Sequence, residues 1–156
     1  MYQPIVRGFG VLLVVIPLVL PGCDFGSQNE VQDRIRERVE NRRQQWQDQD
    51  IEDYKLVYAQ QVGDVRIDTV SVFVTAGTVD SINTTPDVSE DELLVGTVGS
   101  FFDLIEARIG ESDSQFSAGF NNEQGYPVEY TADFQDGRPN QTVLTTALND
   151  SLGVSE

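Results

Sequence analysis

Residues 54–59 (YKLVYA) and 67–76 (IDTVSVFVTA) decide the fold of this chain. In the first stretch, large apolar side chains alternate with Lys55 and smaller residues, which is the period of a half-buried β-strand. In the second, β-branched residues dominate and valines recur at every other position, which favours another strand. Gly63-Asp64 between them predicts a turn, and Ala76-Gly77 predicts a second turn into a strand over 79–82. The centre of the chain is therefore predicted to be an antiparallel meander.

A helix is predicted on each side of this meander. Over residues 31–47, Val31, Ile35, Val39 and Trp46 fall on one helical face, and charged residues occupy the rest. Over residues 98–109, the apolar face is wider and consists of Phe101, Phe102, Ile105 and Ile109. Thr97 is expected to cap this second helix and Gly110 to end it in a left-handed conformation.

The first helix carries five of the nine arginines of the chain, at positions 34, 36, 38, 42 and 43. This local excess of positive charge suits either contact with an anionic surface or an ordinary solvated helix face. We favour the solvated face, because exposed helices commonly carry mixed charges.

Three further strands are predicted after the second helix, over residues 116–120, 126–134 and 142–148. A strong turn signal at 136–140 (DGRPN) separates the last two. Short links between strands require antiparallel pairing. The predicted fold class is therefore α+β: a two-layer sandwich in which two helices cover one face of an antiparallel sheet of about five strands.

The first 22 residues differ in character from the rest. Arg7 is their one charged side chain, and a short apolar run follows it at residues 8–20, interrupted by Pro17. That run is shorter than the roughly 20 residues that a membrane-spanning helix needs, and it is typical of the apolar core of an export signal. The predicted domains are a cleaved signal peptide at 1–22, a tether at 23–30, the α+β domain at 31–148 and a flexible tail at 149–156.

The segment Leu20-Pro21-Gly22-Cys23 resembles the lipobox of bacterial lipoproteins, although Pro21 is an unusual filler. The resemblance implies cleavage between Gly22 and Cys23 and acylation of the Cys23 thiol and of the new amine. The implied location is the cell envelope, with the chain anchored in a lipid bilayer through Cys23 and facing the periplasm or the cell surface. Asp24 resembles an inner-membrane retention signal of enteric bacteria, but the choice between inner and outer membrane stays open.

The net charge of −16 limits the partners of the protein. Repulsion on this scale disfavours nucleic acid as a partner. The acidity itself fits either adaptation to high salt, where ions screen the repulsion, or the ordinary acidity of many secreted domains.

The domain also resembles a family of small secreted or lipid-anchored bacterial proteins of unknown function. The similarity covers residues 31–148 and rests on these positions: Trp46, Asp53-Tyr54, Val72-Phe73-Val74 before Gly77, Phe102, Ile105, Gly125-Tyr126-Pro127 and Asp133. The family implies a close cysteine pair after the first strand, and residues 59–68 contain none. The resemblance implies no reaction.

The residues offer little for catalysis. There is no histidine, Cys23 is the one cysteine, and no phosphate-binding glycine motif occurs. We predict no catalytic residues, no cofactor and no metal site. The expected function is a non-catalytic envelope lipoprotein that binds another protein or a cell-wall component with a sheet face or a strand edge.

Two alternatives remain open at this stage. Paired carboxylates would let the protein hydrolyse an envelope glycan. The acidic clusters at 48–53 and 87–92, or Asp133 with Asp136, would bind calcium with low affinity, although neither cluster has the spacing of a known calcium loop. Four tyrosines, at 54, 58, 126 and 130, are expected in the core, with a ligand-binding sheet face as the alternative.

Overall fold

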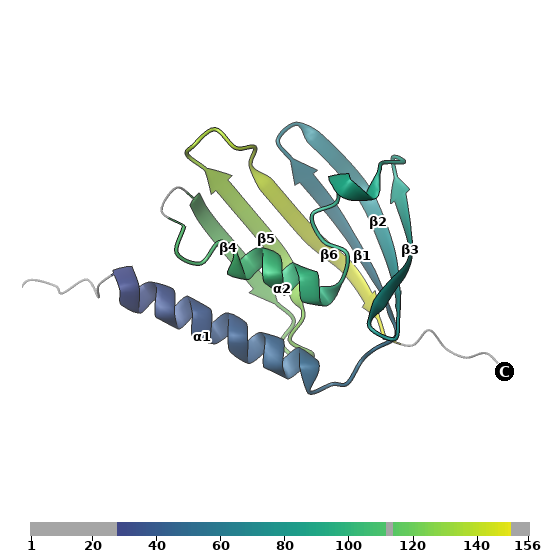
Figure 1. Cartoon of the computed structure of the whole chain (residues 1–156), viewed down its shortest axis with the longest axis horizontal. Helices are drawn as coiled ribbons and strands as arrows, with labels where there is room; N and C mark the ends of the chain where they lie inside the picture. Colours follow the sequence, from purple (N-terminus) through teal and green to yellow (C-terminus); the bar gives the residue numbers. More distant parts are fainter. Residues whose placement is uncertain (1–27, 112–113, 151–156) are drawn as a thin grey trace, which may run out of the picture.

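The computed structural model describes residues 28–111 and 114–150 as two helices, a 3₁₀ turn and six strands (Figure 1). In chain order the elements are α1 (Gln28–Gln47), β1 (Tyr54–Val62), β2 (Val65–Thr75), β3 (Thr78–Thr85), η1 (Glu90–Glu92), α2 (Val98–Glu106), β4 (Ser114–Phe120), β5 (Pro127–Phe134) and β6 (Gln141–Asn149). The signal peptide and Cys23 lie outside the described residues.

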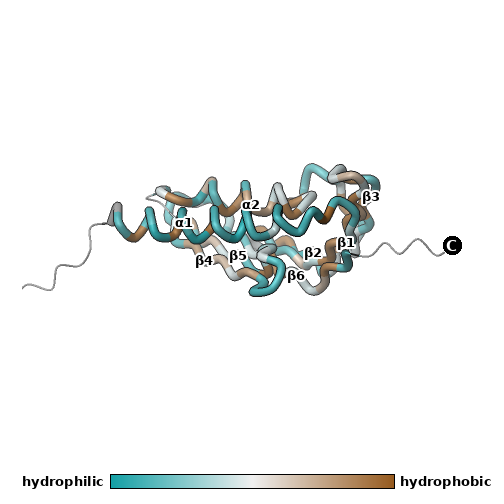
Figure 2. The backbone as a smooth tube through the Cα atoms, turned by 90° about the horizontal axis from the view of Figure 1, so that it is seen from below, coloured by the Kyte–Doolittle hydropathy of each residue, from teal (hydrophilic) through white to brown (hydrophobic). Residues whose placement is uncertain are grey.

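All six strands form one antiparallel sheet in the order β3-β2-β1-β6-β5-β4. The chain runs twice through a helix and a three-stranded meander, and β1 of the first unit pairs with β6 of the second. Leu56 lies opposite Leu148 in that central pair, and Gln60 lies opposite Val143. Figures 1 and 2 show both helices on the same face of the sheet, so the molecule has two layers.

The predicted α+β class is confirmed, and the predicted count of about five strands is wrong. All six predicted strand segments are present, so the error lies in the count and not in a missing strand, and the largest change of length is at β3, which was expected to cover only residues 79–82. The polar residues Asn83, Thr84 and Thr85 continue that strand because they pair with residues 69–71 of β2.

The core lies between α2 and the inner face of the sheet. Val98, Phe101, Phe102 and Ile105 of α2 are fully buried, as the apolar spacing of this helix predicted. Each such side chain stabilises the fold by about 1.5–3 kcal/mol relative to full exposure. Thr97 caps α2, since its hydroxyl accepts a hydrogen bond from the Ser100 amide at 3.0 Å.

Most element ends differ from the predictions by a few residues, and three of these differences affect the helices or the predicted domain boundaries. The structure starts α1 at Gln28, inside the segment that was expected to be a tether, because residues 28–30 extend the helix by nearly one turn. The second helix ends at Glu106 rather than at residue 109, and irregular turns lead to Gly110, whose φ of +93° confirms the expected left-handed conformation. Asn149, expected to begin the tail, is the last residue of β6.

The inner face of β1 holds the segment between β3 and α2 in place. The hydroxyl of Tyr58 donates to the Val95 carbonyl, and the amide of Val98 donates to the Tyr54 hydroxyl at 3.1 Å. Gln60, 3% exposed, donates to the Glu92 carbonyl at 2.8 Å and accepts from the Leu94 amide at 2.9 Å. Val95 and Val98 are buried, so the two tyrosine hydroxyls satisfy backbone groups that have little access to water.

Candidate functional site

The helix α1 covers the sheet incompletely, and this shapes the candidate site. Its apolar side chains are few and one turn or more apart. Val39 and Trp46 are buried, Ile35 is half-buried, and Val31, predicted on the same face, is 44% exposed. The second half of α1 is therefore packed into the domain, whereas its first half is not.

Packing of the second half depends on a close approach to the turn between β4 and β5. A Cβ atom on Gly125 would lie 2.6 Å from the Arg42 carbonyl oxygen, so only glycine fits there. Gln45 donates to the carbonyls of Asn122 and Glu123 at 3.0 and 2.9 Å, and Trp46 meets Tyr126 edge to face at 6.0 Å. The turn is thus fixed against α1.

Two carboxylates link α1 to α2. The Arg43 guanidinium lies 2.7 Å from Asp103 and 2.9 Å from Glu106, and it lies over the Phe102 ring at 5.2 Å. The Arg43 side chain is 26% exposed, whereas the Asp103 and Glu106 side chains are 70% and 38% exposed, so solvent screens the pair with Asp103 more than the pair with Glu106. The contact holds the second half of α1 against α2.

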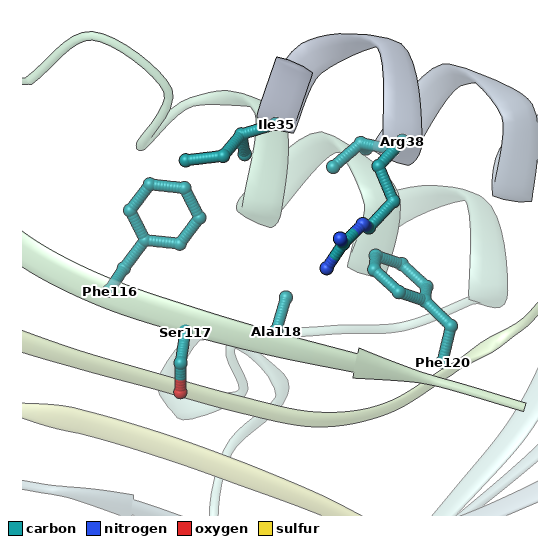
Figure 3. Close-up of a pocket in the computed structure, with 7 residues that line it drawn as sticks. Ile35, Arg38, Phe116, Ser117, Ala118 and Phe120 are labelled. Atoms are coloured by element: carbon teal, nitrogen blue, oxygen red, sulfur yellow. The ribbon is translucent and has the colours of Figure 1, made fainter. Parts of the chain in front are cut away.

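The first half of α1 leaves a groove between the helix and β4 (Figure 3). The groove encloses about 210 Å³, and its lining residues are Ile35, Arg38, Val39, Phe116, Ser117, Ala118 and Phe120. Figure 3 shows the Arg38 side chain reaching down from α1 between the rings of Phe116 and Phe120, and Ser117 pointing away to the other side of the strand. The groove is therefore mainly apolar, with one guanidinium inside it.

The strand that borders this groove is an edge of the sheet. β4 pairs with β5 on one side, and among the described strands it has no neighbour on the other. An edge strand presents unpaired amide and carbonyl groups, which form a template for another strand. An apolar groove beside such an edge has the features that bind an extended peptide.

The arginines around the groove lack acidic partners. Arg34, Arg38 and Arg42 follow one another at intervals of four residues, which places them along one flank of α1. Within the described part of the chain none of the three has a carboxylate within 4.0 Å, whereas Arg36, Arg43, Arg66, Arg108 and Arg138 each have one. We call Arg34, Arg38 and Arg42 the arginine row.

The tyrosines predicted as core residues are core residues. Tyr54, Tyr58 and Tyr130 are at most 4% exposed, and Tyr126 is half-buried against Trp46. Burial raises the pKa of the Tyr54, Tyr58 and Tyr130 hydroxyls above the ordinary value of 10.0. They line the inner face of the sheet under the helices, so they do not form an open binding face.

A second polar cluster lies at the far end of α2, around Arg108. Its guanidinium donates to the Tyr130 hydroxyl at 3.1 Å and pairs with Glu111 at 3.0 Å, and Glu111 also pairs with Arg138 at 3.3 Å. Partial burial opposes ionisation of Glu111, but the two guanidiniums outweigh it and hold the pKa of this carboxyl below its usual range. Both guanidiniums also lie over the Phe134 ring, so the cluster fastens β5 to the end of α2.

The acidic segments lie apart from the groove. Asp50, Glu52, Asp53 and Asp150 line an open hollow of about 460 Å³, where Asp53 accepts a hydrogen bond from the Ala76 amide at 2.8 Å. In the second segment, the Glu92 carboxylate accepts from the Ser89 amide and closes a turn. Among residues 28–111 and 114–150, no group of three or more potential ligands is arranged to hold a metal ion. Calcium binding and glycan hydrolysis stay predictions from composition.

Nor does any helix within the described ranges have the length and apolar content to cross a membrane. The lipid-attachment residue Cys23 and the cleavage position at Gly22 lie before Gln28, so the structure does not place them. The groove and the arginine row were not predicted as a site. The one signal for them in the sequence was the local excess of arginine on α1.

Comparison with known protein families identifies the family of this chain. The model of a family of unknown function, DUF6174, matches residues 38–145. This range runs from the middle of α1 into β6 and contains both units of the sheet. No curated protein matches the chain. The expected resemblance to a family of unknown function over residues 31–148 is consistent with this match.

Proposed function

Because the chain belongs to the family of unknown function DUF6174, which supplies no activity, we propose a function from its residues: a lipid-anchored protein of the bacterial cell envelope whose α+β domain binds a partner without catalysis. The anchor is Cys23, acylated after cleavage behind Gly22. The partner is another envelope protein or a cell-wall component. The domain faces the periplasm or the cell surface.

The segment Leu20-Pro21-Gly22-Cys23 carries this proposal. It follows an apolar run of export-signal length, and its cysteine is the only one in the chain. A thiol is the soft nucleophile that alkylation by a lipid requires. Two or three acyl chains, at about 0.8 kcal/mol per buried CH₂ group, hold a protein firmly on a bilayer.

The position of the domain relative to Cys23 supports the same proposal. Four residues separate Cys23 from Gln28, the first residue of α1. A chain of this length spans at most roughly 17 Å, at about 3.4 Å per residue. Acylation of Cys23 would therefore keep α1 and its groove close to the membrane surface, where partners of an envelope protein are found.

The test is the intact mass of the protein isolated from the membrane of an expressing bacterium. We expect residues 23–156 carrying a diacylglyceryl group, with or without a further acyl chain on the amine. The Cys23→Ser variant should lose the added mass and leave the membrane fraction after the leader is removed, or keep its leader. An unmodified thiol in the wild-type protein, or cleavage elsewhere, would reject the anchor.

A further inference from the structure

The groove between α1 and β4 joins three properties on one side of the domain. It is lined by apolar side chains of Ile35, Val39, Phe116, Ala118 and Phe120. It lies beside the unpaired edge of β4. Its helical wall carries Arg38, and the other two members of the arginine row lie one turn to either side on α1, with no acidic partner among the described residues. Each property alone is common, but together they define the chemistry of one ligand.

We propose that this groove binds an extended acidic segment of a partner protein, which adds to β4 as a seventh strand. In this complex, main-chain groups of the segment pair with the free edge of β4. Every second side chain of the added strand faces the helix layer, and among these the apolar ones enter the groove and the carboxylates meet the arginine row. The proposal gives the partner of the proposed envelope lipoprotein its chemical class, and so it rests on that function for its biological setting.

Charge is the first argument for this occupant. The protein has a net charge of −16, so an acidic ligand is repelled by most of its surface. The arginine row is a local exception, because Arg36 and Arg43, the other arginines of α1, are already paired with Asp33, Asp103 and Glu106. Arg42 already donates to the Gln45 and Asn122 side chains at 2.8 and 3.2 Å, and Arg34 uses its Nε on the Glu30 carbonyl. Among the described residues, Arg38 and the terminal nitrogens of Arg34 therefore remain for charge-assisted hydrogen bonds with a ligand. Complementary charge would then fix the register of the added strand.

The shape of the groove is the second argument, and it separates a peptide from a membrane. Anionic headgroups would also be attracted to the arginine row, but a bilayer is broad and nearly flat. The Arg38 side chain points down into the groove between Phe116 and Phe120 rather than out from the helix (Figure 3). A narrow ligand with an apolar side chain and a carboxylate reaches these groups together. The peptide is therefore favoured over the lipid surface.

The length of β4 sets the size of the ligand. The strand has seven residues, Ser114–Phe120, and a partner strand of similar length would pair along all of it. Side chains of the added strand point alternately toward the helix layer and away from it. The expected sequence pattern is therefore an apolar or acidic residue at every second position, with polar residues between them.

A library of random nonapeptides displayed on phage, selected against the purified acylated protein in detergent, tests this inference. We expect recovered sequences with this alternation and with aspartate or glutamate at one or more of the inward positions. A synthetic peptide of the consensus sequence should slow hydrogen exchange of the amides in β4. Protection confined to other elements, or a selection that recovers no alternating acidic sequence, overturns the proposal.

Substitutions of the exposed Arg38 and of the half-buried Ala118 give the second readout. Arg38→Glu should weaken binding of the consensus peptide by about tenfold or more, because a carboxylate would then face a carboxylate. Ala118→Leu, which fills the groove, should also weaken it. Arg66→Glu, an exposed arginine on β2 near the other edge of the sheet, is the matched control and should leave binding unchanged. Equal effects of Arg38→Glu and Arg66→Glu would contradict a specific groove.

Two further arms separate the alternatives. If the non-acylated Cys23→Ser protein binds phosphatidylglycerol vesicles, loses that binding in the Arg38→Glu background, and selects no peptide, then the arginine row is a membrane contact and the proposal is wrong. Peptide binding by the Cys23→Ser protein should equal that of wild type. That result would stand even if the mass of the natural protein showed no acyl chain, so failure of the anchor and failure of the groove are distinguishable.

Discussion

Three side chains on the inner face of β1 each bind backbone that lies more than 30 residues further along the chain. Tyr54, Tyr58 and Gln60 reach Val98, Val95 and the pair Glu92 and Leu94, respectively. Without these bonds, the Val95 carbonyl and the Val98 amide would be buried without partners, and the half-buried Leu94 amide would lose its bond. A buried donor or acceptor left unpaired costs about 1–3 kcal/mol, which exceeds the net value of a typical hydrogen bond.

The glutamine provides the sharpest test of this role. Gln60→Met keeps the size of the side chain but leaves the Leu94 amide and the Glu92 carbonyl unpaired. We expect the free energy of unfolding to fall by about 1–3 kcal/mol for each group that water cannot reach. Urea denaturation measures the change. The neighbouring Gln61→Met, at an exposed position, is the control and should stay within about 0.5 kcal/mol. Equal midpoints for the two variants would refute the assignment.

The buried tyrosines predict how stability depends on alkaline pH. Burial raises the pKa of Tyr54, Tyr58 and Tyr130, so the folded state keeps its hydroxyls protonated after the unfolded state has begun to ionise near 10.0. The contribution of these tyrosines to the free energy of unfolding is therefore fully present below that pH. It is lost as the pH rises through their folded-state pKa values. Urea midpoints should be lower at about pH 11 than at about pH 9.

The variant Tyr58→Phe serves as the comparison for this pH dependence. It removes one of the three ionising groups, so the decrease between the two pH values should be smaller than in the wild type. Absorbance near 295 nm should report tyrosinate formation and unfolding together. A wild-type midpoint that does not change over this range would count against the effect.

At the scale of elements, α1 depends on the turn between β4 and β5. Gly125 and Gly137 both have positive φ, at +87° and +90°, but their surroundings differ. A Cβ on Gly125 would meet the Arg42 carbonyl at 2.6 Å, whereas a Cβ on Gly137 would have nothing within 4 Å. An alanine would therefore strain the backbone at either position, but only at position 125 would it also collide with α1.

Substituting each glycine with alanine separates these effects. Gly125→Ala should destabilise the protein by about 1–3 kcal/mol more than Gly137→Ala does, because overpacking adds to the backbone strain. Fluorescence of Trp46, the one tryptophan, should change in the first variant and not in the second, since α1 must move away from the turn. If both variants lose equal stability and keep the native fluorescence, the helix does not depend on this approach.

Local periodicity predicted the helices and strands, but it did not predict how they are joined. The alternation in residues 54–59 and the spacing of Phe101, Phe102 and Ile105 each require one face to be buried, and the structure buries those faces. The pairing of β1 with β6 joins residues about 90 positions apart, and no local pattern encodes that choice. The fold class was therefore predicted, whereas the strand order was not.

The sequence did not predict the candidate groove, because the groove also depends on long-range contacts. Phe116, Ala118 and Phe120 alternate as an inward face should, and Ile35 belongs to the apolar stripe of α1. That α1 lies far enough from β4 to leave a cavity between them depends on contacts of its second half with Asp103, Glu106 and the β4–β5 turn. These contacts are long-range. Gln60 was missed as well, because a glutamine in a strand is ordinarily assigned to the solvent face.

At the scale of the whole molecule, the strong acidity predicts a response to salt. At a net charge of −16, repulsion opposes the compact state, and ions reduce it over a Debye length of about 8–10 Å at ordinary ionic strength. If the acidity is an adaptation to high salt, the melting temperature should rise by at least about 5 °C between roughly 0.1 M and 2 M NaCl. Differential scanning calorimetry measures the change. A flat response would favour the alternative, an ordinary acidic secreted domain.

The central position of β6 has a consequence for how the protein is made. β6 lies in the middle of the sheet, between β1 and β5. The meander of β1, β2 and β3 therefore cannot join the hairpin of β4 and β5 in one sheet before β6 pairs with both. A nascent polypeptide that has reached residue 140 cannot yet close its hydrophobic layer. Until residues 141–149 are added, the native six-stranded sheet is therefore incomplete. The order of the strands thus postpones folding until after synthesis is nearly finished.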